Sequence, residues 1–175
     1  PGVDIVIPDF SYLVLNKEKI RGLVVTHGHE DHIGAIPYLL DNINVPIYAT
    51  QLTIGLIEGK LKEHKNLASA KLNVVTPGQT LQFGEFSVEF IHVNHSIPDA
   101  VAFAIKTAAG VIVHTGDFKI DTTPIDGKVI DLARFGELGK RGVLAMLADS
   151  TNAERPGYTM SERRVGNTFR NFFSS

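Results

Sequence analysis

The spacing of hydrophobic residues predicts alternating strands and helices in the first part of the chain. Short apolar runs alternate there with segments whose apolar residues recur at helical spacing. The expected strands are residues 3–7, 22–26 and 46–49, and the expected helices are residues 33–41 and 53–65. Residues 10–19 are expected to form a short helix or a turn. The second of these strands is apolar enough to predict an internal position in a sheet.

The pattern changes to closely spaced strands after about residue 73. Glycines separate short apolar runs with partial alternation, which is typical of a sheet with one face on the core. The expected strands are residues 74–75, 80–83, 87–93, 102–106 and 111–114, with an internal strand at 143–148. A last helix is expected over residues 164–173, with Ser161 as its N-cap. The mixed order predicts a layered α/β fold.

Composition places the chain among soluble globular proteins. It has 175 residues, 43% hydrophobic and 21% charged, enough for one domain with a sizeable core. The absence of cysteine excludes disulfides and thiolate metal sites. The net charge of −2 argues against a surface that is basic overall. No apolar run is long enough to span a membrane and no secretory signal is visible, so we expect a cytoplasmic protein.

Both ends suggest that the sequence is part of a larger protein. The first residue is Pro1, not methionine. The last helix carries Val165, Phe169, Phe172 and Phe173 on one side, and these side chains need a partner surface. We therefore expect further segments of the protein outside this sequence.

The densest group of polar residues follows the apolar run 23–25 directly. This group is His27-Gly28-His29-Glu30-Asp31-His32. His27 and His29, two residues apart, would point to the same side of an extended stretch, whereas Asp31 and His32 open the next helix. One loop can thus supply metal ligands to two neighbouring positions. This predicts two divalent ions about 3.5–4 Å apart. Nitrogen and oxygen ligands suit zinc, and manganese also fits.

Three more polar residues lie just past the ends of expected strands, where a rigid scaffold usually presents functional groups. They are His95, Asp117 and Asp149. The plainer interpretations are a strand-end histidine, a turn aspartate after Gly116, and a cap of a turn or helix. We favour functional roles, because the three residues complete an ordered series with the first cluster.

These motifs resemble those of the metallo-β-lactamase superfamily, whose metal ligands occur in the same order. The longer strings at residues 27–34, 94–99 and 114–119 resemble the ribonuclease J family, in the β-CASP branch of that superfamily. Residues 149–152 are similar to the first additional acidic motif of this branch. The resemblance implies an α/β fold, a metallo-β-lactamase-like αββα sandwich present only in part, without its N-terminal strands and most of the β-CASP domain. Residues 1–148 would be part of the metallo-β-lactamase domain, and 149–175 the start of a β-CASP domain.

The resemblance also implies a role for each polar residue of the series. One metal ion would be bound by His27, His29 and His95. The second ion would be bound by Asp31 and His32.

Two more carboxylates have implied roles beside these ions. Asp117 would bridge the two ions, and Asp149 would assist proton transfer to the leaving group. Asp31 would also orient the hydroxide that two bound divalent cations generate from water near neutral pH. The implied catalytic residues are therefore Asp31 and Asp149.

The implied function is hydrolysis of RNA phosphodiester bonds in RNA maturation and decay. The family resemblance implies 5′→3′ exonuclease and endonuclease action, a preference for 5′-monophosphorylated RNA, and a homo-oligomer, either dimer or tetramer. One alternative is a metallo-hydrolase of a small ester, thioester or lactone, which usually needs no inserted domain after Asp149. A second alternative is a catalytically silent scaffold homologue, which would bind fewer than two metal ions.

Overall fold

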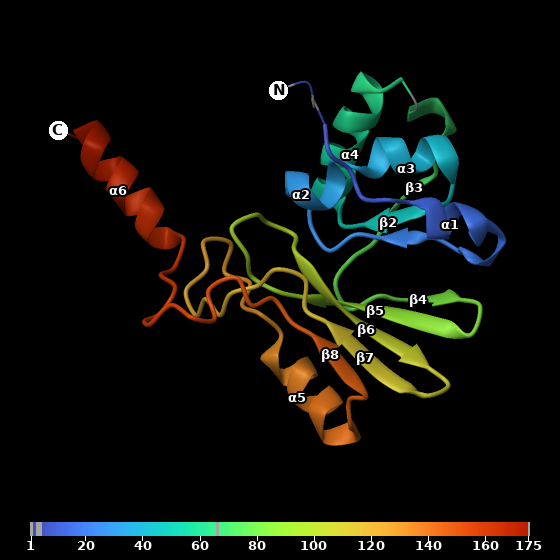
Figure 1. The fold of residues 1–175 in the computed structure, drawn as a ribbon. Coiled ribbons are helices and arrows are strands. Elements are labelled where there is room, and N and C mark those ends of the chain that lie inside the picture. The colour runs from blue at the N-terminus through green and yellow to red at the C-terminus, as the bar shows by residue number, and fades with distance from the viewer. Residues whose placement is uncertain (1, 3–4, 66, 175) are drawn as a thin grey trace. The chain divides into compact units, whose positions relative to one another are not determined.

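In a computed structural model of the chain, residues 2, 5–65 and 67–174 are described (Figure 1). The chain divides into two compact units, Pro1–Thr76 and Pro77–Ser175. Each unit contains a sheet and helices, as the α/β prediction requires. Among the described residues, no helix is both long and apolar enough to cross a bilayer.

Unit 1 is built on a three-stranded parallel sheet. Its strands are β1 (Leu23–Val24), β2 (Ile47–Ala49) and β3 (Leu72–Val74), in the order β1-β2-β3. Its helices are α1 (Ser11–Leu15), η1 (Lys17–Lys19), α2 (Glu30–Ile33), α3 (Ile36–Asn42), α4 (Gln51–Glu63) and η2 (Leu67–Ser69). Parallel strands need crossover connections, which α2 and α3 provide between β1 and β2, and α4 between β2 and β3.

The core of unit 1 forms where α4 packs on the sheet. Ile54, Ile57 and Leu61 of α4 are spaced along one helical face and are fully or almost fully buried, as their spacing predicts. They share a hydrophobic cluster with Ile47 and Ala49 of β2. This packing fixes the sheet edge from which the histidine-rich segment emerges.

Unit 2 is built on a five-stranded sheet in the order β4-β5-β6-β7-β8. Its strands are β4 (Thr80–Phe83), β5 (Phe86–His92), β6 (Val101–Thr107), β7 (Gly110–His114) and β8 (Ala145–Leu147), and its helices are α5 (Leu132–Arg141) and α6 (Arg163–Ser174). Neighbouring strands are antiparallel from β4 to β7, whereas β8 is parallel to β7. Consequently β5, β7 and β8 run in the same direction and end at the same edge of the sheet.

Helix α5 covers one face of this sheet and connects β7 to β8 (Figure 1). Its Leu138 is buried in a cluster with Val113 of β7 and Ala102 of β6. The carboxylate of Asp131 caps the helix by accepting the Arg134 amide at 3.0 Å. Helix α5 thus packs on the strands whose ends carry the polar residues of unit 2.

Most of the expected elements are present, including the strands at 46–49 and 80–83 and the helical segments at 10–19 and 53–65. The helix expected over residues 33–41 is instead two helices, α2 and α3, with a turn between them at Gly34 and Ala35. At the N-terminus of α6, the Ser161 hydroxyl accepts the Arg163 amide at 3.3 Å, close to its expected capping role.

Three strand predictions are wrong in whole or in part. Of the strand expected at residues 3–7, residues 3 and 4 lie outside the described residues, and residues 5–7 form no strand and are exposed. The strands expected at 22–26 and 143–148 are present only in part, as β1 and β8, and each has a hydrogen-bonded neighbour strand on one side only within the described chain. Met146 of β8 is accordingly 65% exposed. An apolar run specifies a strand but not how many neighbours that strand has.

Candidate metal centre

His27 is fixed at the carboxyl end of β1. The Val25 amide donates to the Tyr48 carbonyl at 3.0 Å, which extends the pairing with β2 beyond Val24. His27 follows two residues later and its side chain is fully buried, with 0% exposure. Its Nδ1 lies 3.0 Å from the Thr26 hydroxyl, so this nitrogen is occupied and Nε2 is directed elsewhere. A hydrogen bond to one ring nitrogen is how metal-binding histidines are usually oriented.

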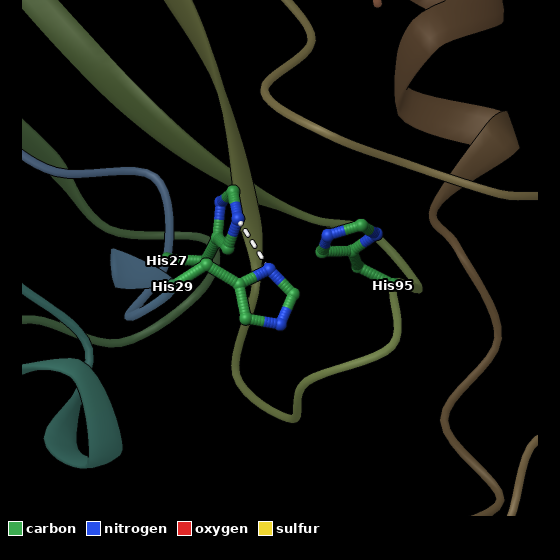
Figure 2. A group of neighbouring side chains, drawn as sticks. All are labelled: His27, His29 and His95. Carbon is green, nitrogen blue, oxygen red and sulfur yellow. Dashed lines mark hydrogen bonds between the residues drawn. The ribbon is translucent and has the colours of Figure 1, made fainter. Parts of the chain in front are cut away.

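The Nε2 of His27 lies 3.1 Å from Nδ1 of His29 (Figure 2). His29 is the N-cap of α2 and has an extended backbone, so the two imidazoles converge as their spacing predicts. Two imidazole nitrogens bound to one tetrahedral zinc are separated by roughly 3.3 Å, given a zinc–nitrogen distance of about 2.0–2.1 Å. The observed separation therefore fits a shared divalent ion.

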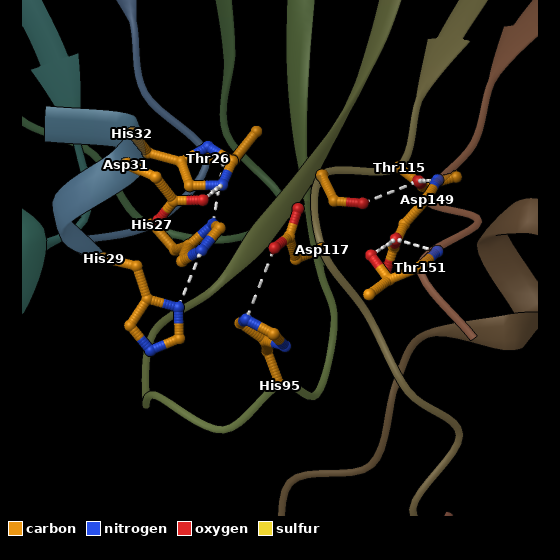
Figure 3. A network of polar contacts seen from close by, with 11 residues as sticks. Thr26, His27, His29, Asp31, His32, His95, Thr115, Asp117, Asp149 and Thr151 are labelled. Carbon is orange, nitrogen blue, oxygen red and sulfur yellow. Dashed lines mark hydrogen bonds and ion pairs between the residues drawn. The ribbon is translucent and has the colours of Figure 1, made fainter. Parts of the chain in front are cut away.

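Asp31 and His32 lie in the first turn of α2, beside these two histidines (Figure 3). The rings of His27 and His32 have centroids 4.1 Å apart, and a ligand atom of each lies within 4.8 Å of the other. The Asp31 carboxylate lies 3.4 Å from Nε2 of His32, and 78% of the Asp31 side chain is exposed. Unit 1 thus gathers the four ligands predicted from its loop, with one carboxylate open to solvent.

The Glu30 side chain faces α4. Its carboxylate lies 2.6 Å from the Nζ of Lys60. The tight turn after α2 depends on Gly34, because a Cβ there would lie 2.7 Å from the Glu30 carbonyl oxygen. A backbone oxygen cannot move aside as a flexible side chain can, so Gly34 is required for this path of the chain.

In unit 2, His95 and Asp117 lie together at the edge where β5 and β7 end. Nε2 of His95 lies 3.7 Å from a carboxylate oxygen of Asp117 (Figure 3). Gly116, with a φ of +58°, turns the chain between Thr115 and Asp117, a conformation that favours glycine. The amide of Gly116 donates to Nδ1 of His114 at 3.0 Å, so the His114 ring has a local structural role.

Asp149 follows β8 and is tied to the end of β7. Its amide donates to the Thr115 hydroxyl at 3.0 Å. Its carboxylate accepts the Thr151 hydroxyl at 2.6 Å and the Thr151 amide at 2.9 Å (Figure 3). These two hydrogen bonds hold the pKa of the Asp149 carboxyl below its usual range, with a smaller contribution in the same direction from His95. Asp149 is therefore ionised at neutral pH.

Each unit brings together its own predicted site residues. The side chains that orient these residues were not predicted, chiefly those of Thr26, Thr115 and Thr151. Their position next to a predicted ligand or strand end was visible in the sequence, but a threonine does not reveal its hydrogen-bond partner. The same holds for Asn94, which precedes His95.

Comparison with known proteins identifies the family of this chain. The family model described as the metallo-beta-lactamase superfamily matches residues 2–153. The chain is 49% identical over 174 residues to ribonuclease J of Helicobacter pylori, covering 98% of this chain and 25% of that protein. It is 49% identical over 172 residues to ribonuclease J of Thermus thermophilus, covering 94% of this chain and 30% of that protein. It is also 43% identical over 164 residues to ribonuclease J2 of Bacillus subtilis, with 94% and 30% coverage.

The chain therefore spans 25 to 30% of the length of these relatives. Two solved structures share its fold at low sequence identity. A protein of unknown function from Enterococcus faecalis matches with a TM-score of 0.57 and 19% identity, over 79% of this chain and 33% of its own. Zn²⁺-bound PqqB from Methylobacterium extorquens matches with a TM-score of 0.56 and 15% identity, over 80% of this chain and 52% of its own. The resemblance to the ribonuclease J family and the expected fold class are confirmed, and the chain belongs to the metallo-beta-lactamase superfamily.

Proposed function

We propose that this chain supplies the metal centre of a ribonuclease of the J type, a hydrolase that cleaves RNA. The observation that carries the proposal is the ordered donor set, in which imidazoles and carboxylates gather at strand ends in both units. The family model matches residues 2–153, a span that includes the donor groups of both units. The similarity to ribonucleases J over 94–98% of the chain supports RNA as the substrate.

In this proposal the first metal ion is held by His27, His29 and His95. The converging nitrogens of His27 and His29, 3.1 Å apart, support it. The buried His27 ring is held by Thr26, so it reaches an ion without reorganisation. Zinc is the first candidate, because three imidazoles suit it and a structural neighbour is zinc-bound. Manganese is compatible with the same donors.

Asp31 and His32 would hold the second ion, and Asp117 would contact both ions. Within unit 1, the neighbouring rings of His27 and His32 support two adjacent metal positions. Within unit 2, the 3.7 Å separation of His95 and Asp117 supports their binding to a common ion. A bound pair of divalent cations lowers the pKa of water and offsets charge on phosphoryl oxygens.

Two carboxylates have further roles in the proposal. Asp31, with most of its side chain in solvent, can orient a water molecule as well as bind a metal ion. Asp149 takes part in leaving-group proton transfer, and because its pKa is lowered it must accept a proton before it can donate one. Thr151 holds the carboxylate in place for this step.

The remaining features of the proposal concern the whole protein. It cleaves 5′-monophosphorylated RNA by 5′→3′ exonuclease and endonuclease action in the cytoplasm, in RNA decay and in maturation that includes rRNA processing. It forms a dimer or tetramer. Residues 1–148 belong to its metallo-β-lactamase domain, and residues 149–175 begin its β-CASP domain.

The test compares His29→Ala and Asp31→Ala with His64→Ala in the purified whole protein. His64 is an exposed histidine after α4, so its variant controls for loss of an imidazole. With a 5′-monophosphorylated RNA oligonucleotide, we expect the first two variants to lose cleavage and the control to keep it. Equal cleavage by all three variants would contradict the proposal.

The same protein preparation also tests the two competing functions. Hydrolysis of thioesters or lactones in the absence of RNA cleavage would favour a small-molecule metallo-hydrolase. A wild-type protein that binds fewer than two metal ions at saturation and cleaves nothing would favour a silent scaffold.

A further inference from the structure

We propose that Asn94 is a positioning residue that sets the separation of His95 and Asp117 in the metal centre. The inference rests on the proposed function, because it assumes that these two side chains bind metal. Asn94 lies two residues after β5 ends and immediately before His95. Only 7% of the residue is exposed, which is unusual for asparagine in a connecting loop.

The side chain of Asn94 uses its two polar atoms on two backbone groups of one segment. Its Nδ2 donates to the Lys128 carbonyl at 2.7 Å, and its Oδ1 accepts the Ile130 amide at 2.8 Å. His92 reaches the same Lys128 carbonyl through its Nε2 at 3.2 Å. These contacts fasten the end of β5 to the segment that leads into α5.

The main chain of Asn94 makes a third connection, to the loop that carries Asp117. Its carbonyl accepts the Lys119 amide at 2.7 Å, and the two residues form an isolated antiparallel bridge. Lys119 is two residues past Asp117, and His95 is one residue past Asn94. One buried residue therefore joins the two loops from which the candidate ligands project.

The segment held by Asn94 is itself anchored. The Asp131 amide donates to the His92 carbonyl at 3.1 Å, and Asp131 then caps α5. Because α5 packs on the sheet through the buried Leu138, the contacts of Asn94 link both ligand loops to a rigid part of unit 2. Removing the amide would leave the Lys128 carbonyl and the buried Ile130 amide without this partner. The backbone pair of Asn94 and Lys119, with the two ligand loops, would then no longer be held to this rigid part by the side chain.

The test measures metal binding directly, with Co²⁺ as the probe and the purified whole protein stripped of metal by a chelator. Asn94→Ala removes both side-chain contacts. Asn94→Asp keeps the shape and the acceptor for Ile130 but loses the donor to Lys128, so it tests the idea even if the alanine variant does not fold. Asn73→Ala is the matched control, because its Nδ2 also bonds a backbone carbonyl, that of Ile47 at 3.2 Å, in a strand of unit 1.

We expect Asn94→Ala to weaken Co²⁺ binding about 10- to 100-fold, the usual effect of losing a residue that orients metal ligands, and to alter the visible absorption of bound cobalt. The added charge of Asn94→Asp would by itself favour a cation, so weaker binding by this variant also supports the tether. Asn73→Ala should keep the wild-type affinity and spectrum. A purely structural role for Asn94 would lower thermal stability without changing the cobalt spectrum, and that result would overturn the inference.

The outcomes also separate this inference from the proposed function. If the wild-type protein binds no Co²⁺, the metal centre and the role of Asn94 are both wrong. If the wild-type protein binds two Co²⁺ ions and both Asn94 variants bind them with unchanged affinity and absorption, only the positioning role is wrong.

Discussion

The ion pair between Arg134 and Glu89 gives a stability prediction that can be worked from the structure. Arg134 of α5 contacts both carboxylate oxygens of Glu89 on β5, through Nε at 2.6 Å and Nη2 at 2.8 Å. Its third nitrogen lies 2.5 Å from Glu137. The Glu89 side chain is 11% exposed, so its charge depends on Arg134 for compensation. The pair fastens α5 to the strand that leads to His95.

We predict that Arg134→Met destabilises the packing of α5 on β5 by about 2–4 kcal/mol at pH 7. Losing one partner of a fully buried pair costs about 3–5 kcal/mol, and losing a hydrogen bond to a charged group costs about 1.5–3 kcal/mol. Because both side chains are partly exposed, we expect a loss of stability that lies between the values for these two cases. Methionine retains much of the aliphatic volume, so the effect reports mainly the unpaired carboxylate.

The effect should depend on pH in a defined direction. The hydrogen bonds from Arg134 hold the pKa of Glu89 below its ordinary value. A carboxyl whose pKa is lowered by folding contributes stability above its unfolded pKa and loses it as the pH falls through the folded pKa. The difference between wild-type protein and Arg134→Met should therefore be full at pH 7 and shrink as the pH falls below about 4.3, the unfolded value for glutamate.

Amide hydrogen exchange over β5 and α5 measures the free energy of opening these segments in the intact protein. Lys140→Met is the matched control, because Lys140 is an exposed cation on the same helix. The double variant Glu89→Gln/Arg134→Met should recover part of the loss, since no unpaired charge remains. Equal protection in Arg134→Met and Lys140→Met, or a loss that stays the same in acid, would refute the reasoning.

Three further predictions concern the metal centre. Gly34→Ala would place a Cβ 2.7 Å from the Glu30 carbonyl oxygen, so it should destabilise unit 1 by about 1–3 kcal/mol and weaken zinc binding. The control Gly59→Ala, with open space around the added Cβ, should do neither. Thermal unfolding measures the stability of each variant, and zinc titration measures its affinity. Thr26→Val removes the hydroxyl at Nδ1 of His27 and should weaken zinc binding about 10- to 100-fold by calorimetry, and unchanged affinity would refute this role. Removing metal with a chelator should lower the Tm, and adding zinc or manganese should restore it; a Tm that does not respond to metal would contradict a site that binds the folded state.

The pairing of strands was the least predictable part of the fold. Apolar runs located β1 and β8, but the number of neighbours of each strand depends on contacts distant in sequence. Helix α5 was not expected, because Gly136 and Gly139 lower its helix propensity and only Leu138 on it is buried. Two signals in the sequence indicated this helix: Asp131, which caps its N-terminus, and Gly142, which follows its last residue.

The candidate ligands were more predictable than the residues that hold them. The two-residue spacing of His27 and His29 made their convergence a direct consequence of an extended backbone. Likewise, His95 and Asp117 were expected at strand ends, and the common direction of β5 and β7 brings them together. The partners of Asn94 lie 34 and 36 residues away along the chain, so no local pattern could identify them.

The central claim is that nitrogens and oxygens from both units bind a pair of divalent ions. Anomalous diffraction from crystals of the whole protein grown with zinc tests it most directly. We predict two peaks about 3.5–4 Å apart, one within bonding distance of His27 and His29 and the other of Asp31 and His32, with Asp117 between them. A single peak away from these side chains, or none at saturating zinc, would contradict the claim.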